Sequence, residues 1–305
     1  MEALPKDNPF IKFNADTLEA VRREFNLDSR IINESIHSLK DWLRKQTHFT
    51  TTDFSKDFLE RTLITCKGSL ERAKERLEKL CVMKFLMPEF LTENVREDET
   101  IFLLEFEFSN SIRSIQFKKS TSTYSSALIR STTESENKPN IGEYLRRYDY
   151  CNGFRLILDY RGINILKVLT QVNPVELKKA MTYVIDGYGM RVQGIHILSE
   201  SKVIDSLVII LKEVLSNKIG NRIHVHKQLD PLYEFIPKDI LPAEYGGKEK
   251  SMAKLAEKCF DVLCSEEHMR YLKEMNKATV NGSCRLVKSE ENLGLPGSFR
   301  SLSVD

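Results

Sequence analysis

The chain has neither a strong net charge nor a long apolar run. Its 305 residues include 46 Lys and Arg against 44 Asp and Glu, which leaves a formal net charge of +2 at pH 7. Because so small a charge offers no general attraction to nucleic acid, we expect no nucleic-acid partner, and any anion site must be local. The longest apolar run in the second half, Leu207 to Leu211, is far shorter than the roughly 20 residues that span a bilayer.

The cysteines lack the spacing of a metal site or a redox motif. They stand at Cys66, Cys81, Cys151, Cys259, Cys264 and Cys284. None forms a CxxC pair or lies at zinc-finger spacing from histidines. The opening residues, MEALPKDNPF, contain no apolar segment of the kind a secretory signal carries. We therefore expect free thiols in a reducing compartment, which indicates a cytoplasmic protein.

Motifs for nucleotide binding and catalysis are also missing. Gly187, Gly189 and Gly194 do not form GxGxxG, and they precede a predicted strand, whereas the dinucleotide-binding glycines follow one. The sequence contains no GxxxxGK[ST] phosphate loop and no GxSxG nucleophile elbow. We predict no catalytic residue and no cofactor, and hence a protein that is not an enzyme.

Three histidines fall where a sheet could bring them together. His224 and His226 lie two residues apart in a predicted strand and so share one face, and His196 lies in the neighbouring predicted strand. Such a cluster could hold a metal ion. Histidines that are satisfied by hydrogen bonds on a sheet are commoner, so we predict no metal site.

The first ninety residues have the pattern of a small helical module. Apolar residues recur at helical spacing between Ile31 and Leu43 and again between Leu70 and Leu80, and a shorter helix is predicted over 58–65. Ser69 is suited to cap the last of these helices, which must end before Pro88.

Strands and helices alternate in the second half. Strands are predicted over 154–158, 194–198 and 222–226, and helices over 173–187 and 202–217. This alternation predicts right-handed crossovers and a mostly parallel sheet, which is an α/β fold.

The region before these strands is less regular. Ile112 to Lys118 could form a strand, and the polar stretch from Ser120 to Asn140 predicts a loop or broken helices. We therefore divide the chain into a helical module (1–95), an α/β domain (96–250) and a C-terminal helix with a surface tail (251–305).

The helix predicted from Lys202 to Leu215 is more apolar than a sheet contact requires. Its apolar residues fill an arc of roughly 160° on a helical wheel. The excess surface needs a second apolar partner, which is either another helix or a bound lipid. Ile209 stands apart on the polar side of the wheel.

Three segments, 191–198, 215–226 and ILPAEYGG at 240–247, carry a family resemblance. Together with the intervening helix they resemble the CRAL-TRIO lipid-binding family, in the branch of alpha-tocopherol transfer protein and cellular retinaldehyde-binding protein. The resemblance extends to the helical module over 39–91 and covers most of residues 30–275.

The resemblance implies that a mobile gate helix roofs one face of the sheet and encloses a small hydrophobic ligand, such as a tocopherol or a retinoid. The implied gate residues are Val203, Ile204, Leu207, Val208 and Leu211, and the implied cavity walls are Tyr183, Val184, Ile195 and Ile197. It also implies binding of phosphatidylinositol bisphosphate at membranes through a basic cleft that contains Arg191, Lys218 and Arg222. We expect a monomer that associates transiently with membrane surfaces.

Two departures from the family pattern leave alternatives open. Gln193 and Ile64 replace arginines of the basic cleft, and the polar segment 131–140 replaces an apolar pocket-lining helix. A phosphoinositide-binding adaptor without a transported ligand is therefore the second hypothesis, and an enzyme on an α/β scaffold is the last. The identity of a ligand stays open, although Tyr183, Tyr188 and Ser199 could anchor its polar end.

Overall fold

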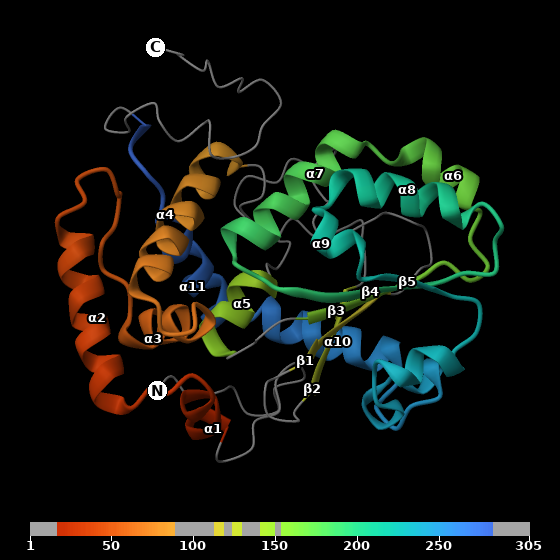
Figure 1. The fold of residues 1–305 in the computed structure, drawn as a ribbon, viewed down its shortest axis with the longest axis horizontal. Coiled ribbons are helices and arrows are strands. Elements are labelled where there is room, and N and C mark those ends of the chain that lie inside the picture. The colour runs from red at the N-terminus through yellow and green to blue at the C-terminus, as the bar shows by residue number, and fades with distance from the viewer. Residues whose placement is uncertain (1–16, 89–112, 119–123, 130–140, 150–153, 283–305) are drawn as a thin grey trace, which may run out of the picture.

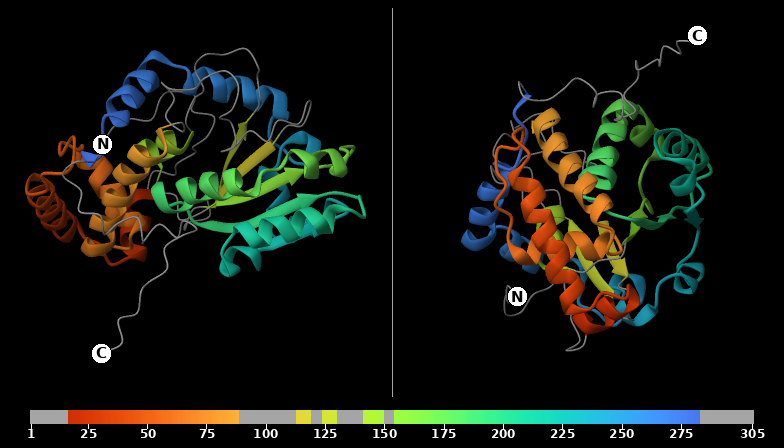
Figure 2. Two further views of the ribbon diagram at one scale, coloured as in Figure 1. Left: turned by 90° about the horizontal axis from the view of Figure 1, so that it is seen from above. Right: turned by 60° about the vertical axis from the view of Figure 1, so that its left-hand side comes forward.

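The computed structural model describes residues 17–88, 113–118, 124–129, 141–149 and 154–282 (Figure 1). The polar segment 131–140 lies outside these residues. The described chain forms a helical N-terminal module beside a five-stranded sheet that has helices on both faces (Figures 1 and 2).

The N-terminal module consists of α1 (Thr17–Glu24), α2 (Ser29–Arg44), α3 (Lys56–Thr65) and α4 (Leu70–Leu86). Side-chain caps define three of the helix starts, because Asp28, Ser55 and Ser69 each accept a hydrogen bond from the first turn. The apolar stripe of α2 is buried as its spacing predicted, at Ile32, Ile36, Leu39 and Leu43. We call the apolar core of this module the N-terminal cluster, which comprises buried residues from Val21 to Met87 together with Ala180, Tyr183, Tyr188, Ala278 and Val280.

The sheet has the strand order β2-β1-β3-β4-β5. Its strands are β1 (Arg113–Lys118), β2 (Tyr124–Ile129), β3 (Phe154–Asp159), β4 (Val192–Leu198) and β5 (Ile223–His226). The three predicted strands β3, β4 and β5 pair in parallel, which confirms the α/β class. β1 pairs antiparallel with both β2 and β3, so a hairpin extends the parallel part of the sheet.

β2 corrects one sequence prediction. It lies in the polar stretch 120–140, for which we expected a loop or broken helices. Two serines follow its first residue, so its composition does not favour a strand, but β1 supplies a complete antiparallel register from Arg113 opposite Ile129 to Lys118 opposite Tyr124. A neighbouring strand can override local preference in this way, because β-propensity depends on pairing and packing.

The helices between the parallel strands cover one face of the sheet (Figure 1). They are α6 (Ile165–Gln171), α7 (Pro174–Thr182), the π-helix Tyr183–Gly187, α8 (Ile204–Val214) and α9 (Asn217–Gly220), whereas α5 (Ile141–Tyr148) precedes the first parallel strand, β3. The predicted helix start at residue 173 is confirmed, since the Asn173 side chain caps α7 by accepting hydrogen bonds from the N–H groups of Val175 and Glu176. Three 3-10 turns (Asp230–Glu234, Lys238–Ile240 and Ala243–Tyr245), α10 (Met252–Leu263) and α11 (Glu266–Asn276) complete the described chain.

Alternate residues of β4 face different cores. Ile195 and Ile197 belong to an apolar cluster with Ile204, Leu207 and Leu211, which we call the α8-side cluster. Leu198 points to the opposite face and packs in the α10-side cluster, whose other members are Ile157, Leu232, Ile236, Leu241, Tyr245, Met252 and Leu255. The strand pleat thus separates two apolar layers.

A buried ion pair joins the parts of the molecule. Lys84 of α4 lies 2.5 Å from Glu143 of α5, and both side chains are fully buried. The Lys84 Nζ also donates a hydrogen bond of 2.7 Å to the carbonyl of Met275 in α11. One ammonium group therefore contacts the N-terminal module, the sheet domain and the C-terminal helix.

The C-terminal segment also pairs with the N-terminal module. Phe49 forms an antiparallel bridge with Val280, and the Asn281 N–H donates to the His48 carbonyl. The boundary that we propose near residue 250 falls in the loop before α10, and the segment beyond it contacts both other parts. The rest of the predicted tail lies outside the described residues.

Candidate functional site

An apolar layer lies between α8 and the sheet. Leu207 and Ile197 are both completely buried, and Ile204, Leu211 and Ile195 are nearly so. Val203 and Val208 are half-buried at the margin of the same cluster. The structure therefore brings together the five predicted gate residues and three of the four predicted wall residues, Val184, Ile195 and Ile197.

The outer side of α8 faces solvent. Ile209 is 57% exposed, as its position on the helical wheel predicted. The neighbouring helices also present apolar side chains outward, since Leu166 of α6 and Val175 of α7 are each 59% exposed. This helical layer consequently has apolar residues on its outside as well as against the sheet.

Apolar packing holds α8 in place. Within the described part of the chain, no side chain of α8 forms an ion pair or a hydrogen bond with another element. The turn that precedes α8 is closed locally, because the Ser201 Oγ accepts a hydrogen bond of 3.3 Å from the Val203 N–H. Apolar contacts have little directionality, so α8 can shift without breaking polar contacts of its side chains.

Tyr183 and Val184 lie in different layers. Tyr183 is fully buried in the N-terminal cluster and meets Tyr188 edge-on with ring centroids 5.2 Å apart. Val184 packs against the α8-side cluster. The π-helix Tyr183–Gly187 changes the residue spacing after α7, so the structure does not place Tyr183 with the other predicted wall residues.

The suggested polar anchors are occupied elsewhere. Tyr188 packs with Tyr183 in the N-terminal cluster. Ser199 is buried at the end of β4, where its Oγ accepts a hydrogen bond of 3.3 Å from the Ser201 N–H. Neither residue belongs to the apolar layer under α8.

The predicted basic residues gather at one end of the sheet. Arg191 and Arg222 directly precede the parallel strands β4 and β5, and Lys218 is exposed on α9 just before β5. The Arg222 guanidinium donates to the Val192 carbonyl, and the Arg191 Nη2 donates to the Thr65 carbonyl at 3.2 Å. Lys218 forms no ion pair among the described residues, so its charge faces solvent.

The two substituted cleft positions have different surroundings. Ile64 is 1% exposed and belongs to the N-terminal cluster. Gln193 is half-buried in β4. Because Ile64 fills apolar space, that position supplies no charge to the cleft.

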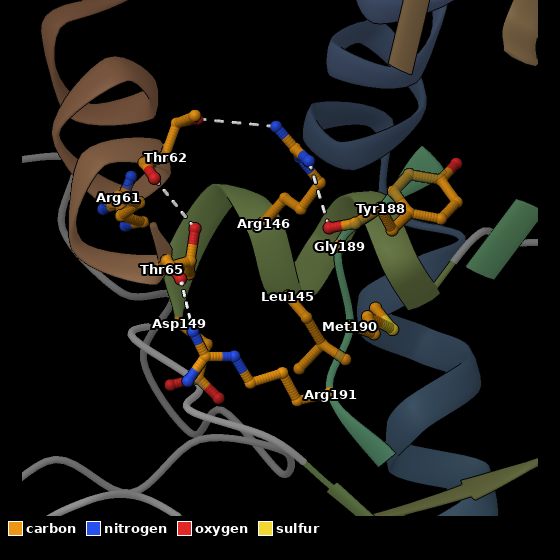
Figure 3. A pocket seen from close by; sticks show the side chains of 10 residues that line it. All are labelled: Arg61, Thr62, Thr65, Leu145, Arg146, Asp149, Tyr188, Gly189, Met190 and Arg191. Atoms are coloured by element: carbon orange, nitrogen blue, oxygen red, sulfur yellow. Dashed lines mark hydrogen bonds between the residues drawn. The ribbon is translucent and has the colours of Figure 1, made fainter. Parts of the chain in front are cut away.

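Arg191 also lines a pocket between α3, α5 and the turn before β4 (Figure 3). The pocket contains about 490 Å³ of empty space, including open solvent at its mouth. Its lining residues are Arg61, Thr62, Thr65, Leu145, Arg146, Asp149, Tyr188, Gly189, Met190 and Arg191. Sequence reasoning missed Arg61 and Arg146, because only the packing of α3 against α5 brings these cations together.

The three histidines form a polar ladder on the opposite face of the sheet. The rings of His224 and His226 each lie 5.2 Å from that of His196, and Phe235 covers His224 at 4.5 Å. The His196 Nδ1 is 3.0 Å from the His226 Nε2, and the Arg155 Nη1 is 3.2 Å from the His196 Nε2. The predicted common face is confirmed.

Burial keeps these histidines neutral. Burial, reinforced by the positive charge of Arg155, lowers the pKa of His196 to about 3. The pKa values of His224 and His226 are also lowered, mainly by burial. No group of three or more His, Cys, Asp or Glu side chains in the described residues is arranged to hold a metal ion.

Comparison with known proteins finds a family match for the part of the chain that contains β2 to β5 and the α8 layer. Residues 124–247 match the CRAL/TRIO domain. The chain is 34% identical over 97 residues to the alpha-tocopherol transfer protein-like protein of Mus musculus, an alignment that covers 32% of this chain and 28% of the relative. It is 33% identical to Clavesin-1 of Xenopus laevis and 32% identical to Clavesin-2 of Homo sapiens, each over 97 residues, 32% of this chain and 29% of the relative.

These alignments span less than a third of the relatives' own length. No helix in the described part of the chain combines the length and the apolar character needed to cross a membrane. The matched region runs from β2 to the loop before α10 and contains both the apolar layer and the basic end of the sheet. Residues 124–247 therefore match a CRAL/TRIO domain, and the resemblance to the CRAL-TRIO family is confirmed over this region.

Proposed function

We propose that this protein binds a small hydrophobic ligand between α8 and the sheet and transfers it between membranes. The observation that carries the proposal is that apolar contacts alone connect the side chains of α8 to its neighbours in the described structure. A helix held in this way can move aside for an apolar ligand and close over it. The relatives named alpha-tocopherol transfer protein-like support a ligand of the tocopherol kind, and a retinoid is the alternative that the family resemblance implies.

The energetics favour exchange at an apolar surface. Exposing Ile204, Leu207 and Leu211 to water would cost roughly 5–9 kcal/mol, at about 1.5–3 kcal/mol for each fully buried side chain. A ligand or a bilayer that replaces the lost apolar contacts removes most of this cost. α8 is therefore expected to open at a membrane and to stay closed in water.

Membrane contact would use the outer side of the helical layer. Leu166, Val175 and Ile209 offer apolar contacts, and Lys218 with Arg191 and Arg222 offers positive charge near the starts of β4 and β5. We propose that the basic residues bind phosphatidylinositol bisphosphate and that the association is transient. Free thiols at Cys66, Cys81 and Cys264 suit a cytoplasmic site of action.

The test is to identify what the protein carries. We expect organic-solvent extraction of the purified protein, followed by mass spectrometry, to release a stoichiometric hydrophobic molecule. A fluorescent tocopherol analogue serves as a binding probe. Leu211→Trp overfills the layer between α8 and β4 and should weaken binding roughly tenfold, because overpacking a core costs about 1–3 kcal/mol.

The matched control is the same substitution on the outer side of the same helix. Ile209→Trp adds the same bulk at an exposed position and should bind the probe like the wild type. Equal loss of binding in both variants would contradict a ligand site beneath α8.

A phosphoinositide-binding adaptor without a transported ligand is the second candidate. The close packing of α8 on the sheet favours the adaptor, since Leu207 is completely buried there. If extraction released no hydrophobic molecule and the probe did not bind, while vesicles containing phosphatidylinositol bisphosphate still did, the adaptor would be the better description.

A further inference from the structure

The end of α7 lies where two apolar clusters meet. Leu177 of α7 belongs to the α8-side cluster, whereas Ala180 in the next turn belongs to the N-terminal cluster. The π-helix continues this division, because Tyr183 is buried in the N-terminal cluster and Val184 packs against the α8-side cluster. Met190 packs against both clusters. A shift of this segment would therefore change one wall of the apolar layer under α8.

A guanidinium of the N-terminal module holds the C-terminal end of the π-helix. The Nη1 of Arg76, on α4, donates to the carbonyls of Ile185 and Asp186 at 3.2 and 3.0 Å. Carbonyls at the end of a helix lack partners in a following turn, and a cation placed there also complements the helix dipole. Two hydrogen bonds thus join α4 directly to the end of the segment formed by α7 and the π-helix.

The surroundings of Arg76 make this contact specific. Gly189 has a φ of +70°, which L side chains rarely adopt, and a Cβ at this position would overlap the Arg76 guanidinium. Burial is the main cause that lowers the pKa of Arg76. A charged group that has lost part of its water needs hydrogen-bond acceptors, and the carbonyls of Ile185 and Asp186 supply them.

The two neighbouring helices α7 and α8 are held in different ways. α4 packs against the π-helix, and α7 packs against α8 (Figure 1). In the part of the chain that the structure describes, the side chains of α8 make only apolar contacts with other elements. The end of α7, by contrast, is tied to the N-terminal module by charge-assisted hydrogen bonds, which are stronger and more directional.

We propose that Arg76 is a positioning residue, which keeps the α7 wall of the ligand site in place while α8 moves. This inference rests on the ligand-binding function proposed above. Arg76 acts through the backbone carbonyls of Ile185 and Asp186 and not through contact with the ligand. Without these hydrogen bonds Val184 and Ile185 would pack less firmly against the apolar layer, and a ligand held there would leave faster.

The first measurement is amide hydrogen exchange, which needs no ligand. The N–H groups of Tyr188 and Met190 donate to the carbonyls of Tyr183 and Val184 at 3.1 and 3.4 Å. Arg76→Gln should speed exchange at these two amides by about tenfold, which corresponds to about 1.4 kcal/mol of local opening. Arg72→Gln, at an exposed position of α4, should exchange like the wild type.

The second measurement is the rate at which a bound fluorescent tocopherol analogue passes to acceptor vesicles. We expect Arg76→Gln to release the probe about tenfold faster than the wild type, in step with the local opening. Arg76→Lys keeps a cationic donor and should give intermediate rates in both measurements. A general loss of stability would instead speed amide exchange in α2 to the same degree.

Further arms keep the inference separate from the proposed function. Gly189→Ala displaces the guanidinium without removing its charge, and it tests the inference if Arg76→Gln does not fold. The inference is overturned if folded Arg76→Gln exchanges its amides like Arg72→Gln, or if it releases the probe at the wild-type rate. A wild type that binds no probe contradicts the proposed function, whereas amide exchange still decides whether Arg76 holds the π-helix.

Discussion

The hydrogen bond from Arg155 fixes which ring nitrogens donate and which accept along the histidine ladder. A guanidinium can only donate, so the Nε2 of His196 must accept the hydrogen bond from Arg155. The proton of neutral His196 then lies on Nδ1, which donates to the Nε2 of His226. The chain of hydrogen bonds thus runs from β3 through β4 to β5. A proton added at the His226 Nε2 would remove the lone pair that accepts the hydrogen bond from His196.

Acid should destabilise the fold through this ladder. The pKa of His196 is about 3 in the folded protein and about 6.5 in an unfolded chain. Between these values only the unfolded chain takes up the proton, so the free energy of unfolding falls as the pH falls. The loss should be on the order of 2 kcal/mol by pH 5, measured by urea unfolding at pH 7.5 and pH 5.

Two variants test this prediction: His196→Gln removes the titrating group, and His37→Gln is the control. A glutamine at 196 can accept from Arg155 and donate to His226 without titrating, so the pH dependence should flatten. His37 is exposed on α2, where its Nε2 lies 3.2 Å from the Asp41 Oδ2, and its replacement is the control that removes a histidine outside the ladder. Similar pH profiles for wild type and His196→Gln would contradict the assignment.

The sequence could place the three histidines together but could not identify Arg155 as their partner. A two-residue spacing puts His224 and His226 on one face, and adjacent strands bring in His196. Arg155 reaches His196 across Gly194, where a Cβ would lie only 2.6 Å from the Arg155 Nη1. That contact depends on the parallel register of β3 and β4, which no local pattern encodes.

At the scale of elements, local signals predicted the parallel strands and the helices α2, α3, α4, α7, α8 and α10, whereas α1, α5, α6, α9 and α11 were not predicted. The helices α2, α4 and α7 each begin at a capping side chain, which is Asp28, Ser69 or Asn173. The spacing of the apolar residues that follow each cap also favours a helix. β2 was missed because its partner strand, and not its composition, stabilises it. The π-helix after α7 was missed as well, and with it the separation of Tyr183 from the layer under α8.

The short helix α9 should contribute to membrane attachment. Lys218 is exposed there, and a basic residue near an anionic surface contributes about 1 kcal/mol. Lys218→Gln should therefore weaken binding to phosphatidylcholine vesicles containing phosphatidylinositol bisphosphate by about fivefold at low salt. Vesicle sedimentation measures the change.

Lys254→Gln is the control for this prediction, because Lys254 is exposed on α10, across the sheet from α8. It should bind vesicles like the wild type. A loss of equal size in both variants would point to general attraction by net charge, and not to a surface at α9.

At the scale of the whole molecule, Lys84 links three parts that are distant in sequence. It pairs with Glu143 and donates to the Met275 carbonyl, and both charged side chains are fully buried. Removing one partner of a buried pair leaves the other charge without compensation. The helical module therefore does more than flank the CRAL/TRIO domain, since it neutralises a carboxylate inside it.

Lys84→Met should lower the free energy of unfolding by about 3–5 kcal/mol, as expected when a buried ion pair loses one member. The double variant Lys84→Met with Glu143→Leu should recover most of this loss, because no buried charge remains. Urea unfolding measures both effects. Lys79→Met, at an exposed position of α4, should change stability little, and a loss as large as that of Lys84→Met would argue against the ion pair.

The same contact limits how the chain can be divided. A fragment cut to residues 124–247 would keep Glu143 but lose both Lys84 and the α11 carbonyl. In such a fragment the Glu143 carboxyl group would have to take up a proton, or water would have to enter the interior around it. Either change would loosen α5. The segment that matches the family is thus shorter than the unit that can fold. A fragment that folds by itself must therefore include the helical N-terminal module and α11.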